Sequence, residues 1–225
     1  MNMKWGPRAF GLFCLLAFSA AWLPSQAWAT APGRTEFEIL MNGKPVGRHS
    51  VSVSTAADLT TVRIAIDMAG KVGPFGFTYR HRCEETWRGQ QLTSLSCTDK
   101  ENRAAKSVEA KLAGTTLVVN GTGFKGNAPM SVLPSSWWRR STINQTRLLD
   151  SRDGKLAHVS VNRVGSDVID VNGDRVRADH FRMRGAVNTD IWYDNAGRWV
   201  RTAFKLAGQS FDYRKLTPVS ASPRE

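Results

Sequence analysis

The sequence contains few of the residues on which metal and disulfide chemistry depend. Its 225 residues include three cysteines and four histidines. The histidines are His49, His81, His158 and His180, and no two of them show H-x-H or H-x-x-x-H spacing. Metal centres in proteins usually draw ligands from such close spacings. The sequence therefore indicates no metal site, and we expect no cofactor.

Enzyme signatures are also lacking. No G-x-S-x-G string occurs, and the Ser135-Ser136 pair has no neighbouring base in the sequence. The string from Gly121 to Gly126 matches G-x-G-x-x-G, but it does not sit in a strand-turn-helix unit, so we interpret it as a chance match. No motif assigns a catalytic residue, and the sequence favours a protein without catalytic activity.

One apolar run stands out, from Ala9 to Leu23, preceded by Lys4 and Arg8 and followed by Ala27-Trp28-Ala29. A basic start, an apolar core of about 15 residues and a small-x-small site are typical of a secretory signal peptide. The run is too short to span a bilayer comfortably. We expect cleavage after Ala29, a periplasmic or secreted protein, and no transmembrane segment after cleavage.

The mature chain is basic. Without residues 1–29 it retains 29 Lys and Arg against 19 Asp and Glu, a formal charge of +10. The basic residues are scattered rather than gathered in one run, which argues against a nucleic-acid partner. For an exported protein, we expect anionic partners such as lipid head groups or other envelope components, or else ordinary solvation of a charged surface.

Only Cys83 and Cys97 remain after cleavage, and both would lie in an oxidising compartment, where a disulfide is the default. The segments Phe77–Trp87 and Gln91–Thr98 are typical of two strands of one hairpin. A loop of three to five residues between them places position 83 opposite position 97. The sequence therefore predicts a cross-strand disulfide.

From Glu36 onward, alternating or β-branched segments are separated by Gly, Asn and Asp at intervals of roughly 8 to 12 residues. This pattern predicts an all-β fold. We expect residues 30–216 to form a single antiparallel β-barrel or strongly curved half-barrel of about a dozen strands, with one short helix or lid segment. Residues 217–225, rich in Pro, Ser and charge, are predicted to be a disordered tail.

Two hairpins are specified locally. Asn42-Gly43 is a strong hairpin turn signal between alternating segments. The Asp-Asn-Ala-Gly turn near residue 196 predicts that Trp192 pairs with Trp199 and Asp190 with Arg201, which would stack two indoles beside an ion pair.

Residues 121–143 interrupt the alternating pattern. They contain Gly, Pro, two adjacent tryptophans and two arginines. Ser135 or Ser136 could cap a short helix from Trp137 to Thr142. Two interpretations stay open: a functional lid over a cavity, or a plug helix whose Trp137 is ordinary core.

The first cysteine strand carries the most suggestive inner face. Period two places six side chains on it: Phe77, Tyr79, His81, Cys83, Glu85 and Trp87. Because buried ionisable groups are costly unless paired or solvated, His81 and Glu85 indicate a structural hydrogen-bonded pair, a ligand cavity or an acid–base pair. The candidate ligand-binding residues are Tyr79, His81, Glu85, Trp87, Trp137 and Trp138.

The order of several short motifs resembles an uncharacterised family of exported bacterial proteins, known only as a domain of unknown function. The motifs are Asn42-Gly43, Val46-Gly47-Arg48-His49, Glu85-Thr86-Trp87, Leu133-Pro134-Ser135-Ser136-Trp137-Trp138, and Trp192-Tyr193-Asp194 with Gly197 and Trp199. This resemblance spans nearly the whole mature chain and implies no reaction. A signal peptide before one curved sheet is also distantly similar to the lipoprotein-carrier group of periplasmic half-barrels, a similarity of fold alone.

Three hypotheses follow. The first is a periplasmic barrel that binds or carries a lipid or acylated envelope ligand in its aromatic interior, with residues 121–143 as the lid. The second is a structural or adaptor protein that offers its surface to other envelope proteins. The third is a hydrolase that uses His81 and Glu85.

Signal cleavage gives the first testable prediction. Protein purified from the envelope of its own cells should begin at Thr30, because the small residues Ala27 and Ala29 flank the expected cleavage site. Intact-mass spectrometry measures this directly. A mass that includes residues 1–29 would contradict it.

Overall fold

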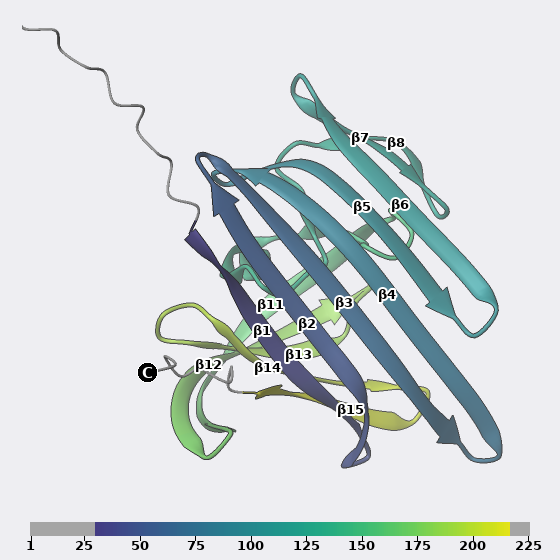
Figure 1. Cartoon of the computed structure of the whole chain (residues 1–225), viewed down its shortest axis with the longest axis vertical. Helices are drawn as coiled ribbons and strands as arrows, with labels where there is room; N and C mark the ends of the chain where they lie inside the picture. Colours follow the sequence, from purple (N-terminus) through teal and green to yellow (C-terminus); the bar gives the residue numbers. More distant parts are fainter. Residues whose placement is uncertain (1–29, 217–225) are drawn as a thin grey trace, which may run out of the picture.

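The alternating segments form one curled sheet in the computed structural model, which describes residues 30–216 (Figure 1). The predictions for residues 1–29 and 217–225 lie outside the described residues. The strands are β1 (Thr30–Met41), β2 (Lys44–Ala56), β3 (Leu59–Val72), β4 (Phe75–Arg88), β5 (Gln91–Glu101), β6 (Ala104–Ala113), β7 (Thr116–Gly121), β8 (Lys125–Pro129), β9 (Leu133–Pro134), β10 (Arg147–Leu149), β11 (Leu156–Val171), β12 (Asp174–Gly185), β13 (Thr189–Asp194), β14 (Trp199–Leu206) and β15 (Gln209–Leu216). No helix within this range has the length and apolarity needed to cross a membrane.

The sheet is open and strongly curled, which confirms the half-barrel expectation. Its strand order is β8-β7-β6-β5-β4-β3-β2-β1-β15-β14-β13-β12-β11-β10-β9, so the first strand pairs with the last. Every pairing is antiparallel except that of β9 with β10. The two edge strands are joined by residues 130–132, and the Val132 N–H donates to the Pro129 carbonyl at 3.0 Å. The curl therefore brings the two edges of the sheet together.

A second contact draws the two ends of the sheet together. The Gly123 N–H donates to the Asp153 carbonyl at 2.8 Å, linking the segment after β7 to the loop after β10. A Cβ on Gly121 would lie 2.2 Å from that same carbonyl oxygen, so only glycine permits this approach. The contact holds residues 150–154 against the opposite end of the sheet.

The concave face of the sheet carries the main core. Alternation on β3 places Val62 and Ile64 inside, with Ile66 and Met68 packed against the core. The Asn42-Gly43 turn also forms as predicted, with both residues at positive φ. Period two on long strands is thus a reliable guide to the inner face.

The number of strands and several boundaries were predicted wrongly. The sheet has fifteen strands rather than about a dozen. The short strands β8, β9 and β10 lack alternation and were missed. A tight turn joins β3 to β4, and β11 continues as one strand through a bulge next to Gly165.

The predicted helix over Trp137–Thr142 was also wrong. A short 3₁₀ helix covers Arg140–Asn144, and the preceding Arg139 is extended. Trp137 and Trp138 lie in bends before this helix and pack against the core of the sheet.

The hairpin of β13 and β14 forms in a different register from the predicted one. Tyr193 pairs with Trp199 and Trp192 with Arg201, with a bulge between the two pairs. One extra residue reverses which face a side chain points to. Trp199 therefore joins the inner core, whereas Trp192 packs on the outer face.

This register also removes the predicted ion pair between Asp190 and Arg201. Asp190 pairs instead with His180 and Arg182 on β12, and Arg201 pairs with Asp212 on β15. Both faces of this hairpin carry buried residues. On the outer face, Trp192 and Val200 lie in a second apolar cluster with three residues of the β11–β12 hairpin: Ile169, Val171 and Ala178.

The predicted disulfide joins Cys83 on β4 to Cys97 on β5, which are directly opposite each other. Both are buried in the inner core. The pair links two strands close to the middle of the inner face, so its contribution to stability should be measurable.

Replacing both cysteines by alanine should lower the free energy of unfolding by about 3 kcal/mol, because the closed loop of the unfolded chain is short and a loop of roughly 15 residues gives that value. Urea unfolding of the oxidised protein and of the double variant measures the difference. Equal midpoints for the two proteins would show that the disulfide does not stabilise the fold.

Candidate ligand-binding cavity

The curled sheet does not fill its own interior. A cavity of about 330 Å³ lies between the inner faces of β2, β3 and β4 and three chain segments: residues 135–138, 150–152 and 186–189. Val51, Ile64 and Ile66 form an apolar wall on the sheet side. Leu206, which is 63% exposed, and the exposed Lys205 lie at one end, where the cavity opens to solvent.

The structure brings four of the six predicted ligand-binding residues to this cavity. Tyr79, His81, Trp137 and Trp138 line it. Glu85 and Trp87 do not, because both are almost completely buried. They lie beneath the indole of Trp138 instead.

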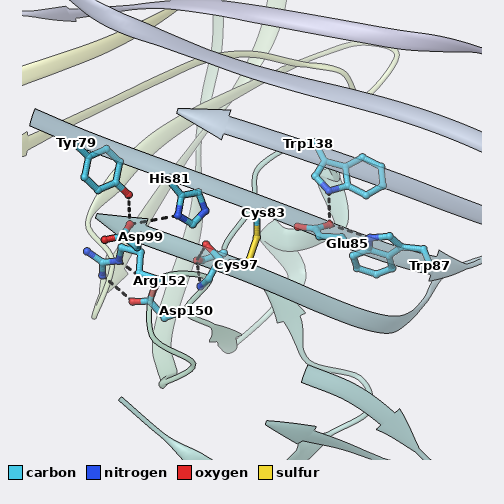
Figure 2. The surroundings of a disulfide bond; sticks show 12 residues. Tyr79, His81, Cys83, Glu85, Trp87, Cys97, Asp99, Trp138, Asp150 and Arg152 are labelled. Carbon is cyan, nitrogen blue, oxygen red and sulfur yellow. Dashed lines mark hydrogen bonds and ion pairs between the residues drawn. A yellow bond between two sulfur atoms is a disulfide. The ribbon is translucent and has the colours of Figure 1, made fainter. Parts of the chain in front are cut away.

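Glu85 anchors the segment 135–139, which carries Trp138, to the sheet (Figure 2). Its Oε2 atom accepts hydrogen bonds from the indole N–H of Trp87 at 2.9 Å and of Trp138 at 2.8 Å. The two indole rings meet edge to face with centroids 5.8 Å apart. Burial raises the pKa of this carboxyl above its ordinary value of 4.5, although the hydrogen bonds to its oxygen oppose that shift.

Three further contacts hold the same segment. The Arg139 guanidinium lies over the rings of Trp87 and Trp138, at 4.2 and 4.8 Å from their centroids. The Tyr193 hydroxyl donates to the Trp137 carbonyl at 2.9 Å, and the Ser135 N–H donates to the Leu149 carbonyl at 2.9 Å. Residues 135–139 therefore form a fixed wall of the cavity rather than a plug of its interior.

A polar group of residues lies at the other side of the disulfide (Figure 2). The Tyr79 hydroxyl donates to Asp99 Oδ2 at 2.5 Å, and Nδ1 of His81 lies 3.3 Å from the same oxygen. Burial alone would raise the pKa of Asp99, but its hydrogen bonds with His81 and Tyr79 outweigh burial and lower it. Asp99 is therefore an anion at neutral pH.

Arg152 approaches this group from the loop after β10. Its guanidinium makes a two-point contact with Asp150, at 3.0 and 2.7 Å, and it lines the cavity together with that carboxylate. The pairing with Asp150 raises the pKa of Arg152 further, so it is always a cation. Its side chain is half exposed, which places a fixed positive charge at the cavity wall.

His49 is the site residue that sequence reasoning missed. It lies on β2, lines the cavity and is only 6% exposed. Neither ring nitrogen has a hydrogen-bond partner among the described residues. Burial, and secondarily the charge of His81, lowers the pKa of His49 to about 3, so the imidazole is neutral at neutral pH. Alternation with Val51 and Val53 was the available signal for its inward direction.

His81 and Glu85 do not form the suggested pair. His81 contacts Asp99, whereas Glu85 contacts two indoles, and the disulfide lies between the two groups (Figure 2). Ligand atoms of His81, Cys83 and Cys97 lie within 4.8 Å of one another. Because the two sulfurs are joined, they are not thiolates, and thiolates are what metal ions bind.

Residues 37–215 match a family described as "Domain of unknown function (DUF6134)". The chain belongs to this family. The expected membership of an uncharacterised family is thus confirmed, and membership assigns no reaction. No curated protein matches the DUF6134 chain significantly.

Among solved structures, the DUF6134 chain is similar to the crystal structure of a beta-barrel-like protein of the domain of unknown function DUF1849 from Brucella abortus. The TM-score is 0.60 and the sequence identity 11%, with 82% of this chain and 95% of the other covered. At that identity the similarity shows a shared barrel-like fold and nothing about activity.

Replacing Glu85 tests the anchor. Glu85→Ala should lower the free energy of unfolding by about 3 kcal/mol, because it leaves two buried indole N–H groups without an acceptor and opens a cavity. Glu85→Gln keeps an acceptor oxygen and should cost less, and Trp138→Phe should lose about one hydrogen bond. Urea unfolding at pH 7 measures all three.

The pH dependence supplies a control. Since the folded protein holds the Glu85 proton to a higher pH than the unfolded chain, stability from this group is complete below pH 4.5 and declines as pH rises through the raised folded pKa. Glu85→Gln should lack that decline. Parallel stability curves for the wild type and Glu85→Gln would contradict the assignment.

Proposed function

We propose that this protein binds a single-chain amphiphile, such as a fatty acid or another acylated envelope component, in the cavity beneath residues 135–138. The observation that carries the proposal is the cavity itself, with an apolar wall, aromatic side chains and an open end. A sheet whose interior was filled by its own side chains would leave no room for a ligand.

The cavity volume sets the size of the ligand. Small-molecule sites span roughly 300–1,000 Å³, and about 330 Å³ lies at the lower end of that range. One acyl chain fits such a space better than a two-chain lipid. Val51, Ile64 and Ile66 would contact the chain, since they form the continuous apolar wall.

The charges along the cavity favour an anionic end group. Arg152 and Lys205 both line the cavity. The Arg152 side chain is 52% exposed and forms an ion pair with Asp150. Lys205 is exposed and has no ion pair among the described residues. A carboxylate or phosphate at the open end would lie beside these two groups while the chain extends inward.

The periplasmic or secreted location belongs to the same proposal. It rests on the basic, apolar and small-x-small parts of residues 1–29. In an envelope, free and esterified acyl chains are abundant, and a barrel-like protein with one small apolar cavity is suited to hold them away from water.

A variant that places a larger side chain in the cavity tests the proposal. Val187 lines the cavity in the turn between β12 and β13, so Val187→Trp should weaken the binding of sodium dodecanoate by about tenfold or more. Isothermal titration calorimetry measures the affinity. Val118→Trp is the matched control, because Val118 is 45% exposed on β7 and does not line the cavity, and it should bind as the wild type does.

Absence of dodecanoate binding to the wild type, together with no lipid on protein purified from its own cells by native mass spectrometry, would overturn the proposal. A reproducible protein partner in that case would favour the adaptor hypothesis instead. Equal weakening by Val187→Trp and Val118→Trp would show that binding occurs outside the cavity.

A further inference from the structure

His49 lines the cavity, and both of its ring nitrogens are buried without a hydrogen-bond partner among residues 30–216. Its neighbour His81 also lines the cavity; its Nδ1 atom has no hydrogen-bond partner either but lies 3.3 Å from the Asp99 carboxylate. A buried polar atom without a partner costs free energy, so such groups call for an explanation.

The surroundings of His49 cannot satisfy it. Phe37, Trp199 and Tyr213 pack around the imidazole, with ring centroids 6.1, 5.1 and 5.8 Å away. The indole N–H of Trp199 is directed elsewhere, to the Thr202 hydroxyl at 2.8 Å and the Arg201 carbonyl at 3.1 Å. These aromatic contacts hold the imidazole in place at the cavity and give neither of its nitrogens a hydrogen-bond partner.

We propose that the ligand carries a hydroxyl group on its acyl chain, and that His49 binds this hydroxyl inside the cavity. The inference rests on the proposed function and adds the chemical class of the ligand. It identifies the ligand as a hydroxylated acyl chain rather than a simple fatty acid.

The chemistry of a neutral imidazole selects the hydroxyl. One ring nitrogen donates a hydrogen bond and the other accepts one, and a hydroxyl group can complement either. A carboxylate only accepts and an ammonium group only donates, and either charge would be costly against the aromatic wall around His49. The low pKa of His49 agrees with a permanently neutral imidazole that could not compensate such a charge.

The test compares dodecanoate with a series of dodecanoates that carry one hydroxyl group at successive chain positions. Isothermal titration calorimetry is carried out on the wild type, His49→Leu and His49→Gln. At least one hydroxylated isomer should bind the wild type about tenfold more tightly than dodecanoate, because leaving a buried polar group unpaired has a cost of that order. His49→Leu should abolish the preference, so that this variant binds the hydroxylated isomers no more tightly than it binds dodecanoate.

His49→Gln keeps a donor and an acceptor and should retain part of the preference, which a merely structural role for His49 would not produce. The unliganded His49→Leu variant should also unfold at a higher temperature than the wild type, because two unpartnered buried atoms are replaced by an apolar side chain. If that variant fails to fold, the wild-type series and His49→Gln still decide the question.

Two failures are distinguishable. Dodecanoate binding to the wild type without preference for any hydroxylated isomer, or a preference that persists in His49→Leu, overturns this inference and leaves the proposed function standing. No binding of any member of the series to the wild type overturns both.

Discussion

The hydrogen bonds to the buried carboxyl of Glu85 are the constraint on which the cavity depends. One oxygen of this side chain holds the indole of Trp87, which belongs to the same strand, and the indole of Trp138, which arrives from a segment 53 residues away in the sequence. With Trp138 fixed, the segment 135–138 lies across the concave face of the sheet and lines the cavity. The two serines and two tryptophans of that segment then form a wall facing β2, β3 and β4.

The curl of the sheet makes this crossing possible. The edge strands β8 and β9 are consecutive in the sequence, so the chain that closes the curl also begins the segment that lies across the interior. Near Gly121 the backbone of the loop after β10 approaches too closely for any side chain, and this brings Arg152 to the cavity. The curl of the sheet therefore positions both the segment 135–138 and Arg152 at the cavity.

The buried polar groups on the inner face differ in the hydrogen-bond partners that the fold gives them. Two indoles bind Oε2 of Glu85, and Tyr79 and His81 contact Asp99, although Oε1 of Glu85 and Nδ1 of His81 have no hydrogen-bond partner among the described residues. His49 has no partner on either ring nitrogen. A protein that needed only a stable sheet would gain from an apolar side chain at this position, so the presence of His49 next to the cavity is the observation that connects the structure to a ligand.

The features predicted correctly are those that period two controls over a long strand. On β4, alternation alone identified His81, Cys83 and Glu85 as inward-facing, and the hairpin with β5 then placed Cys97 opposite Cys83. Exported character remains a prediction, because residues 1–29 lie outside the described part of the chain.

The errors arose where one residue is inserted or where strands are too short to alternate. The bulge beside Trp192 separated two tryptophans that were expected to stack, and β8 to β10 carry no pattern of their own. The contacts of Glu85 with Trp138, and of Arg152 with the cavity, join distant parts of the sequence. No local pattern encodes such contacts, so the separation of His81 from Glu85 into two clusters could not be foreseen.

The most direct test of the central claim is a crystal structure of protein purified from its own cells without removal of lipids. The account predicts continuous density for one chain inside the cavity, running from the open end beside Lys205 and Arg152 along Ile66 to the imidazole of His49. A cavity filled by the protein's own side chains, with the indole of Trp138 released from Glu85, would contradict it.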